Sequence, residues 1–395
     1  MYSKKEYTFF MRYDFALIGA NGMQGKIAAR DLLEAGHSVL LCSNDRINID
    51  QLLEKYPGKS GFAQIDLRDM ASVSPVLEDS GASVLINCAI DDYNLKVTAL
   101  AAEIGMHMVD LGSEIPMHKE QEELDGEFKA KNLIAISGAG STPGINNVMV
   151  AHVKDRFDTI DKAHLGFVWD SNMPIFLPPF SMDAIMYEFA EPATVFMNGT
   201  YVEKSPTEPT GIDHEYMEVG KQEVHYVKHV EQWTIAQFLK DKGVKNVVEY
   251  AGFPLHSYNV IKMLLDNGFL SKTPLMVDGK QIRPIDATIE VLRRIPIPEG
   301  YTEVENLWVK VYGTKGGKPH IEEMDCLART LPGWEDATCN IDTSFPISII
   351  AQMILKGEIT GSGFHAPETI VPPELFFKHL GEHQIEVYDN GKRIN

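Results

Sequence analysis

The first residues of this sequence that could do chemistry are the glycines of a turn, Gly19, Gly22 and Gly25. They follow a short apolar run at 15–18 and precede a segment, 26–35, in which apolar residues recur at helical spacing. In a strand, turn and helix of this kind the glycine backbone approaches a pyrophosphate, and the N–H groups and dipole of the helix bind it. We therefore predict a dinucleotide site, with a spacing one residue longer than usual; the alternative is a turn without a ligand.

The tip of the next predicted strand, 37–42, decides between NAD and NADP, because an acidic residue there normally binds the ribose 2′-hydroxyl. Ser43 and Arg46 could both bond to a 2′-phosphate, whereas the carboxylate of Asp45 would repel it. We expect NADP and leave NAD open. The alternative for Arg46 is a solvated loop charge.

Two later predicted strands, 83–89 and 106–112, also end in polar residues. Ligands of doubly wound sheets lie at the carboxyl ends of the strands, which places Asn87, Asp91, Tyr93 and Asp110 near the nicotinamide. Each could equally be an ordinary loop residue. The candidate cofactor-binding residues are Gly19, Asn21, Gly22, Met23, Gln24, Gly25, Ser43, Asn44, Asp45, Arg46, Asp66, Asn87, Cys88, Ala89 and Tyr93.

A second turn, rich in glycine and proline, follows the predicted strand 133–137. Thr142 can cap a helix that starts near Ile145, with Pro143 at its first position. An exposed helix N-terminus with hydroxyl and amide donors could receive a substrate carboxylate; the alternative is a plain capped turn. The candidate substrate-binding residues are Tyr93, Thr142, Pro143, Gly144 and Asn146.

The segment 223–231 contains two histidines and a glutamate that could face a cleft. We interpret it as a strand, which puts His225, His229 and Glu231 on one face. Ligands four residues apart on a strand lie about 13 Å apart along the chain, too far for one ion. We therefore predict no metal, and interpret His229 and Glu231 as groups that line the substrate cleft. The alternative is a solvated strand.

Composition narrows the function classes. The formal net charge of −20 argues against nucleic acid and anionic membranes as partners, since both need a basic face. We find no apolar run near the ~20 residues that cross a bilayer. Four cysteines without CxxC spacing indicate reduced thiols and a cytoplasmic protein. A length of 395 residues favours two domains.

The elements that must position these residues fall into two patterns. Apolar strands alternate with helices up to residue 153, as in a parallel α/β sheet, and shorter strands with turn signals follow from residue 161, as in a mostly antiparallel α+β domain. Thr234 would cap a helix at 235–242. Further predicted elements are a charged surface helix at 119–131, strands at 162–169, 193–197, 201–203, 224–230, 247–250 and 307–312, an apolar helix at 344–355, a loop at 361–368, a helix at 372–380 and a strand at 384–388.

Six short motifs occur along the chain in the order of a known family. They are G-A-N-G-M-Q-G at 19–25, I-N-C-A at 86–89, G-M-H-M-V-D-L-G at 105–112, T-P-G-I-N-N at 142–147, H-V-E-Q-W-T at 229–234 and G-F-H-A-P-E at 363–368. Together they resemble the saccharopine dehydrogenase family. The resemblance implies an α/β fold with an N-terminal Rossmann domain at 1–145, an inserted α+β substrate and dimerisation domain at 146–343, and a C-terminal segment at 344–395 that packs back on the Rossmann domain.

The resemblance also implies an enzyme that transfers a hydride reversibly between NAD(P) and a carbon bearing nitrogen. The substrate would be an amino acid such as saccharopine or lysine, and the enzyme a homodimer. Imine formation and hydrolysis need an acid or base, for which Asp110, His229 and Glu231 are the candidate catalytic residues.

The sequence departs from the family pattern at the first glycine turn, with Asn21 and one extra residue, at the strand tip 43–46, and at the loop 91–93. Asp91 and Asp92 in that loop, with the high negative charge, would suit a cationic substrate. The first alternative is therefore a polyamine reductase similar to carboxynorspermidine or homospermidine synthase. The second is a protein that binds the dinucleotide as a sensor without turnover.

Overall fold

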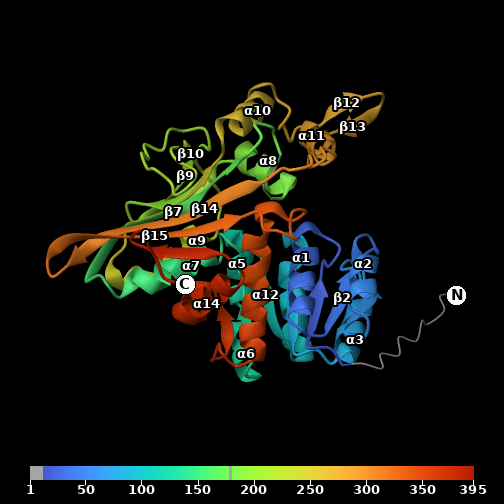
Figure 1. Ribbon diagram of the computed structural model, residues 1–395. Helices are drawn as coiled ribbons and strands as arrows, with labels where there is room; N and C mark the ends of the chain where they lie inside the picture. Colours follow the sequence, from blue (N-terminus) through green and yellow to red (C-terminus); the bar gives the residue numbers. More distant parts are fainter. Residues whose placement is uncertain (1–11, 178–179) are drawn as a thin grey trace. The chain divides into compact units, whose positions relative to one another are not determined.

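The computed structural model describes residues 12–177 and 180–395 (Figure 1). Residues 1–11 of the expected first domain, and the prolines at 178–179, lie outside the described part. The chain forms two compact units. The first unit contains the residues up to Gly144 together with Thr343–Phe376, and the second contains Ile145–Asp342 together with Phe377–Asn395.

The first unit is built on a parallel sheet of seven strands in the order β16-β6-β5-β4-β1-β2-β3. Its central strands are short apolar runs buried along their whole length, as expected for a sheet covered on both faces. The strands are β1 Phe15–Ile18, β2 Val39–Ser43, β3 Ser60–Gln64, β4 Val84–Asn87, β5 His107–Asp110, β6 Ile134–Ile136 and β16 Gly363–His365. The order of β1 to β6 is that of a dinucleotide-binding Rossmann fold.

Helices connect these strands, as the apolar periodicity predicted. They are α1 Met23–Glu34, α2 Ile49–Lys55, α3 Met70–Ser80, the short η1 Asp91–Tyr93, α4 Asn94–Ile104, α5 Ile115–Glu122, α6 Asp125–Ala130 and α13 Pro367–Ile370. Two predictions were wrong in detail. The surface helix expected at 119–131 is two helices, α5 and α6, with Leu124 between them packed against the core. The loop expected at 361–368 contains β16, which extends the sheet beside β6.

The second unit is built on a sheet of nine strands, in which β18-β17-β15-β14-β7-β11-β8-β9 lie in order and β10 also pairs with β11. Only the β7–β11 pair is parallel among the pairings described, which confirms the mostly antiparallel α+β prediction. The strands are β7 Thr159–Ser171, β8 Ala193–Met197, β9 Thr200–Lys204, β10 Val224–Tyr226, β11 Asn246–Gly252, β14 Glu303–Lys315, β15 Lys318–Arg329, β17 Glu386–Asp389 and β18 Lys392–Arg393.

The remaining elements of this unit are a separate hairpin and several helices. The hairpin consists of β12 Leu275–Val277 and β13 Lys280–Ile282. The helices are α7 Ile145–Lys154, α8 Met182–Ala190, α9 Glu231–Phe238, η2 Lys240–Lys242, α10 Leu255–Asp266, α11 Pro284–Leu292 and η3 Thr338–Asn340. Two further helices, α12 Ile341–Leu355 and α14 Pro373–Glu382, contain the points where the chain passes between the units.

The expected strand at 224–230 is wrong beyond Tyr226. Strand β10 ends there, and a turn leads directly into α9, which starts at Glu231. The buried side chains of Val227 and Val230 fix this turn, and Nε2 of Gln232 donates a hydrogen bond of 2.8 Å to the carbonyl oxygen of Val227. Thr234 therefore lies inside α9 and does not cap a later helix.

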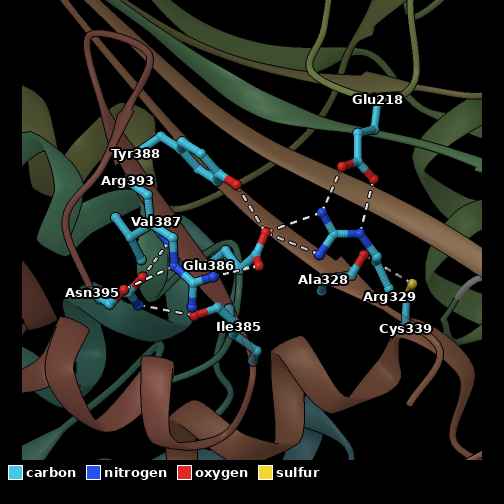
Figure 2. Close-up of polar contacts among 10 residues, drawn as sticks. All are labelled: Glu218, Ala328, Arg329, Cys339, Ile385, Glu386, Val387, Tyr388, Arg393 and Asn395. Atoms are coloured by element: carbon cyan, nitrogen blue, oxygen red, sulfur yellow. Dashed lines mark hydrogen bonds and ion pairs between the residues drawn. The ribbon is translucent and has the colours of Figure 1, made fainter. Parts of the chain in front are cut away.

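The C-terminal segment 344–395 divides between the two units. Ser348 Oγ of α12 donates a hydrogen bond of 2.5 Å to Oδ2 of Asp31 in α1, within the first unit. In contrast, β17 pairs with β15 of the second sheet. Figure 2 shows how charge holds that pairing: Glu386 accepts hydrogen bonds from Arg329, at 3.0 Å, and from Arg393, at 2.6 Å. Among the described helices, none combines the length and apolar character needed to cross a membrane.

Candidate active site

The glycine turn lies where the strand order of the first sheet reverses, between β1 and β4. Gly19 follows β1 with a φ of 79°, a conformation that favours glycine. A Cβ atom on Gly19 would lie 2.7 Å from the carbonyl carbon of Cys88 and 2.8 Å from the nitrogen of Ala89. The turn and the exit of β4 are therefore in direct contact at the crevice where doubly wound sheets bind dinucleotides.

The start of α1 fits a pyrophosphate. A Cβ atom on Gly25 would lie 2.1 Å from the carbonyl oxygen of Gly19, so the first turn of the helix packs closely on the glycine turn. Gly22 is the N-cap residue and provides no side chain over the helix N-terminus. Met23 and Gln24 form the first turn behind it. The residues present thus form the backbone cradle that a dinucleotide requires.

The tip of β2 is tied to the glycine turn by side-chain hydrogen bonds. Nδ2 of Asn21 donates to Oδ1 of Asn44 at 3.2 Å and to Oδ1 of Asp45 at 2.9 Å. The buried Ser43 hydroxyl donates to the carbonyl oxygen of Asp45. Arg46 is paired with Asp50 and half exposed, so its guanidinium can reorient toward a phosphate. The structure thus ties the tip of β2 to the glycine turn through Asn21, whereas binding of a 2′-phosphate by Ser43 and Arg46 stays a prediction.

The other predicted cofactor residues differ in what their side chains do. Asn87 is fully buried and donates a hydrogen bond of 2.6 Å to Oδ1 of Asn94, which fixes the start of α4. Tyr93 is partly buried against the core of the first unit. Asp66 is exposed and bonded to Arg68, which lowers the pKa of its carboxyl to about 2. These contacts give Asn87 a structural role; a cofactor role for all three stays a prediction.

Asp110 lies at the end of β5, fully buried, and its carboxylate accepts several hydrogen bonds. Its Oδ1 accepts from the nitrogens of Gly112, at 2.9 Å, and Gly138, at 3.3 Å, and its Oδ2 accepts from Nε2 of Gln121 at 2.7 Å. Burial raises the pKa of Asp110 in spite of these donors. The contacts indicate that Asp110 positions the loops after β5 and β6. A catalytic role for it stays a prediction.

The predicted substrate turn is sharply bent. Gly144 has a φ of 139°, and a Cβ atom on it would lie 1.8 Å from the carbonyl oxygen of Gly140, so only glycine fits. The peptide bond between Thr142 and Pro143 is cis. Asn146 is fully buried in α7, and its Nδ2 donates a hydrogen bond of 3.1 Å to the carbonyl oxygen of Gly166. The amide nitrogen is therefore bonded within the second unit, whereas the buried amide oxygen makes no hydrogen bond within the described chain. Carboxylate binding by the turn stays a prediction.

His229 lies between two carboxylates of the second unit. Its Nε2 is 3.4 Å from Oε1 of Glu188 in α8, and its Nδ1 is 3.5 Å from Oε2 of Glu231, the first residue of α9. Glu249 of β11 completes the group, because its carboxylate, His229 and Glu231 each offer an atom within 4.8 Å of the others. We call these four residues the His229 cluster. All four side chains are close to fully buried.

The cluster keeps a proton on its imidazole. Burial lowers the pKa of His229, but the carboxylates of Glu231 and Glu188 outweigh burial and raise this pKa well above its usual value. The two carboxylates therefore favour the protonated form of His229. The second carboxylate oxygen of Glu188, Oε2, is buried and makes no hydrogen bond within the described chain.

The strand on which the distance argument against a metal rested is wrong beyond Tyr226, because β10 ends there and α9 starts at Glu231. The turn brings His229 and Glu231 together, and the three groups of His229, Glu231 and Glu249 have the spacing of ligands. A metal ion would have to displace the proton that the carboxylates favour on His229. The expectation of no metal stays a prediction.

Sequence analysis missed Glu188 and Glu249. Glu249 stands in the otherwise apolar run V-V-E-Y-A of β11, and a charged residue inside a buried strand was the available signal. Glu188 lies 41 residues before His229 and gave no comparable signal. His225, which was expected beside His229, instead stacks on the ring of Tyr258 with 4.2 Å between the ring centres.

A cavity of about 500 Å³ in the second unit contains none of the predicted residues. Its charged lining includes Asp170, Glu218, Glu303 and Arg329. Arg329 is held by Glu218 at 2.6 Å and by Glu386 at 3.0 Å (Figure 2), so its charge is already neutralised. The cavity therefore gives no reason to move the site away from the His229 cluster.

Comparisons with known proteins agree with this geometry. The family model of the saccharopine dehydrogenase NADP binding domain matches residues 15–136, and that of the saccharopine dehydrogenase C-terminal domain matches residues 140–385. A carboxyaminopropylagmatine dehydrogenase from Synechocystis is 22% identical over 387 residues, which cover 93% of this chain and 94% of that protein.

Two solved structures are similar over nearly their whole length. The saccharopine dehydrogenase (L-Glu forming) of Saccharomyces cerevisiae has a TM-score of 0.71 at 14% identity, over 95% of this chain and 99% of that one. The homospermidine synthase of Legionella pneumophila, solved with NAD, has a TM-score of 0.65 at 12% identity, over 97% of this chain and 92% of that one. At these identities the likeness shows a shared fold.

The C-terminal family model alone covers more than half of the chain, and the NADP-binding model covers the crevice of β1 and β4 described above. The chain therefore belongs to the saccharopine dehydrogenase family, as an oxidoreductase whose first unit is the NADP-binding domain of that family.

Proposed function

We propose that this oxidoreductase interconverts an imine and a secondary amine on a substrate with a cationic amine end, and that the His229 cluster binds that end. The observation that carries the proposal is the position of His229 between Glu188 and Glu231, at 3.4 and 3.5 Å, in a buried part of the second unit. With Glu249, three carboxylates surround one imidazolium.

The charge of the cluster explains why a cation would bind. When the three carboxyls are ionised, one imidazolium leaves an excess of negative charge, and buried charge is costly unless it is paired. An ammonium or guanidinium group offsets that excess and can donate hydrogen bonds to the carboxylates. The buried Oε2 of Glu188 makes no hydrogen bond within the described chain and could accept one of them.

When bound, the nicotinamide supplies or accepts the hydride. The protein must then orient the carbon–nitrogen bond and move a proton. His229 can hold that proton, because its neighbours favour the protonated imidazole. Carboxylate binding by the turn of Thr142 and Gly144 stays a separate prediction.

The relatives support an amine substrate and differ in its class. The Synechocystis relative is named for carboxyaminopropylagmatine, and the Legionella structure is a homospermidine synthase. The yeast structure is a saccharopine dehydrogenase. The buried carboxylates favour a carboxylated polyamine over saccharopine or lysine, which remain the second candidate. We propose a cytoplasmic homodimer as the working form.

The test follows the reduced-nicotinamide absorbance with NADPH or NADH. One set of reactions contains an amino-aldehyde or keto acid with agmatine or putrescine, and the other contains aminoadipate semialdehyde with glutamate. Turnover with the cationic amines supports the proposal. Turnover with glutamate alone overturns the substrate class, and cofactor binding without any turnover favours the non-catalytic sensor.

Glu188→Gln provides the matched site test, since it keeps the shape of the side chain and removes its charge. We expect KM for the amine to rise about tenfold or more, as for loss of a charge-assisted hydrogen bond, while KM for NADPH stays the same. Glu191→Gln is the control, because Glu191 follows α8 and pairs with Lys228 and Lys272 outside the cluster. Equal amine KM values in both variants would show that the cluster does not bind the amine.

A further inference from the structure

Three polar side chains follow one side of the largely apolar helix α12. Ser344, Ser348 and Gln352 recur every fourth residue, so they lie one above another on the helix surface. Both serines are fully buried, and Gln352 is nearly so. A buried hydroxyl or amide is costly unless it is hydrogen-bonded, so this stripe needs polar partners.

The partners belong to α1, the helix that begins at the dinucleotide cradle and lies beside α12 (Figure 1). The Ser344 hydroxyl donates a hydrogen bond to Oε1 of Gln24, in the first turn of α1. The Ser348 hydroxyl donates one of 2.5 Å to Oδ2 of Asp31, about two turns further along α1. Nε2 of Gln352 in turn donates to the Ser348 hydroxyl at 3.2 Å. Hydrogen bonds therefore join the two helices at two levels.

These bonds fix the position of α1 along its own axis. A buried polar pair in an apolar helix interface selects one register, because every other register leaves its polar groups unpaired. A shift of α1 by one residue would move Gln24 about 1.5 Å relative to Ser344. The first turn of α1 would move by the same amount relative to the glycine turn after β1.

The backbone of this first turn is the part of α1 that meets a pyrophosphate. The first N–H groups of a helix have no acceptor within the helix, and in a dinucleotide fold they donate to phosphate oxygens. Gln24 is the second residue of α1, so its backbone is part of the cradle. A binding site works poorly when its supporting residues leave it about 1 Å too loose.

The neighbouring residue of α12 supports a different turn. The hydroxyl oxygen of Thr343 lies 3.0 Å from that of Ser141, in the turn that ends at Gly144. A Cβ atom on Gly140 would lie 3.2 Å from Cγ2 of Thr343. These contacts and those between α12 and α1 lie within the first unit. Thr343 and Ser344 are therefore adjacent in sequence and each make a hydroxyl hydrogen bond, but to different turns.

We propose that Ser344 is a positioning residue of the NADP site: through Gln24 it holds the first turn of α1 where its N–H groups meet the pyrophosphate. Ser348 and Asp31 anchor the same pair of helices further along. The proposal needs no contact between Ser344 and the cofactor. It rests on the NADP-binding first unit and is independent of the substrate proposed above.

Ser344→Ala tests the proposal in the full-length protein, by titration of NADPH fluorescence. The substitution removes the hydroxyl without adding a group, and we expect the Kd for NADPH to rise about tenfold, the equivalent of one hydrogen bond. Thr343→Val is the matched control, because it removes the neighbouring hydroxyl that supports the other turn. We expect both variants to melt at similarly lowered temperatures, while Thr343→Val keeps the wild-type Kd.

Gln24→Ala shows whether Ser344 acts through Gln24. This substitution breaks the same hydrogen bond from the side of α1, so the Kd for NADPH should rise as well. In the Gln24→Ala background, Ser344→Ala should have little further effect, because the two residues contribute through one interaction. A general weakening of the fold would instead raise the Kd by the same factor in both backgrounds.

Two results would overturn the proposal. The first is an NADPH affinity of Ser344→Ala that equals that of Thr343→Val. The second is an equal effect of Ser344→Ala with and without Gln24→Ala. Both measurements use NADPH alone, so they do not depend on whether the proposed amine is a substrate.

Discussion

Nδ1 of His229 lies 3.5 Å from Oε2 of Glu231, although the two residues are only two positions apart in a segment that resembles a strand in sequence. On a strand they would share a face about 7 Å apart. The turn into α9 closes that distance and places the carboxylate against the imidazole. The charge state of His229 therefore depends on the position where α9 begins.

The pH dependence of activity should follow this contact. Glu231→Gln removes the carboxylate that most strongly raises the pKa of His229. The pKa should fall, so the imidazolium is lost at a lower pH. We expect the alkaline limb of kcat/KM for imine reduction to move to lower pH. Glu191→Gln should leave it in place, and an unchanged limb in Glu231→Gln would show that His229 does not supply the proton.

Stability should depend on pH through the same residue. The pKa of His229 is higher in the folded chain than in the unfolded one, so its charged form stabilises the fold. That contribution is fully present below about pH 6.5 and is lost as the pH rises through the folded pKa. Urea unfolding between these pH values should therefore show a falling free energy of unfolding. His229→Gln should flatten this slope, and an equal slope in both proteins would contradict the assignment.

Adding one methyl group at Gly25 should affect both stability and NADPH binding. Gly25→Ala places a Cβ atom 2.1 Å from the carbonyl oxygen of Gly19, so the helix must move away from the turn. We expect a loss of about 1–3 kcal/mol in unfolding free energy, as for overpacking, and NADPH binding weakened tenfold or more. Gly126→Ala in α6 meets no atom within 4 Å and should stabilise the protein by about 0.5–1 kcal/mol. Calorimetry and fluorescence titration with NADPH measure both effects.

Cofactor choice should depend on Arg46. Arg46 follows the tip of β2, where a 2′-phosphate would lie, and its guanidinium is half exposed and paired with Asp50. Arg46→Ala should lower kcat/KM for NADPH by about ten- to a hundredfold, the value of one charge-assisted hydrogen bond, and leave NADH nearly unchanged. Arg68→Ala, which removes another exposed arginine, is the control. An equal loss with both cofactors would mean that Arg46 acts on the fold of the loop.

The fold was predictable because it depends on local patterns. Apolar runs of four or five residues specified β1 to β5, and helical periods specified α1, α3 and α4, whereas α2 was not predicted. Strand β16 was missed, since three residues between glycine and proline carry no period of their own and pair only through the neighbouring β6. The Asp278–Gly279 hairpin was also missed, although its turn residues are a direct signal.

Of the candidate site, only the dinucleotide-binding glycine turn was predictable from the sequence. The glycine turn is recognisable from the spacing of its own residues. The His229 cluster, in contrast, combines residues from α8, the turn before α9, α9 itself and β11. Alternation suggested a strand through His229, but burial of Val227 and Val230 decided in favour of a turn. Tertiary packing thus overrode a local pattern, and only the structure could bring Glu188 and Glu249 to the imidazole.

A substitution at Asp110 tests whether this residue only positions loops or takes part in catalysis. Its carboxylate accepts hydrogen bonds from Gly112, Gly138 and Gln121 while fully buried, and Asp110→Asn would set an NH₂ group against at least one of these donors. An unsatisfied buried donor costs about 1–3 kcal/mol, so we expect the unfolding free energy to fall by that amount.

If Asp110 only positions the loops after β5 and β6, kcat/KM per folded molecule should fall less than tenfold and its pH profile should keep its shape. Thermal unfolding and a pH series of initial rates on the same samples give both quantities. Thr98→Val is a suitable control, because Nε2 of Gln121 also donates a hydrogen bond of 2.7 Å to the Thr98 hydroxyl, away from the strand ends. A stable Asp110→Asn protein with a changed pH profile would instead make Asp110 the acid–base group, since loss of a titrating carboxyl changes the profile and a packing defect does not.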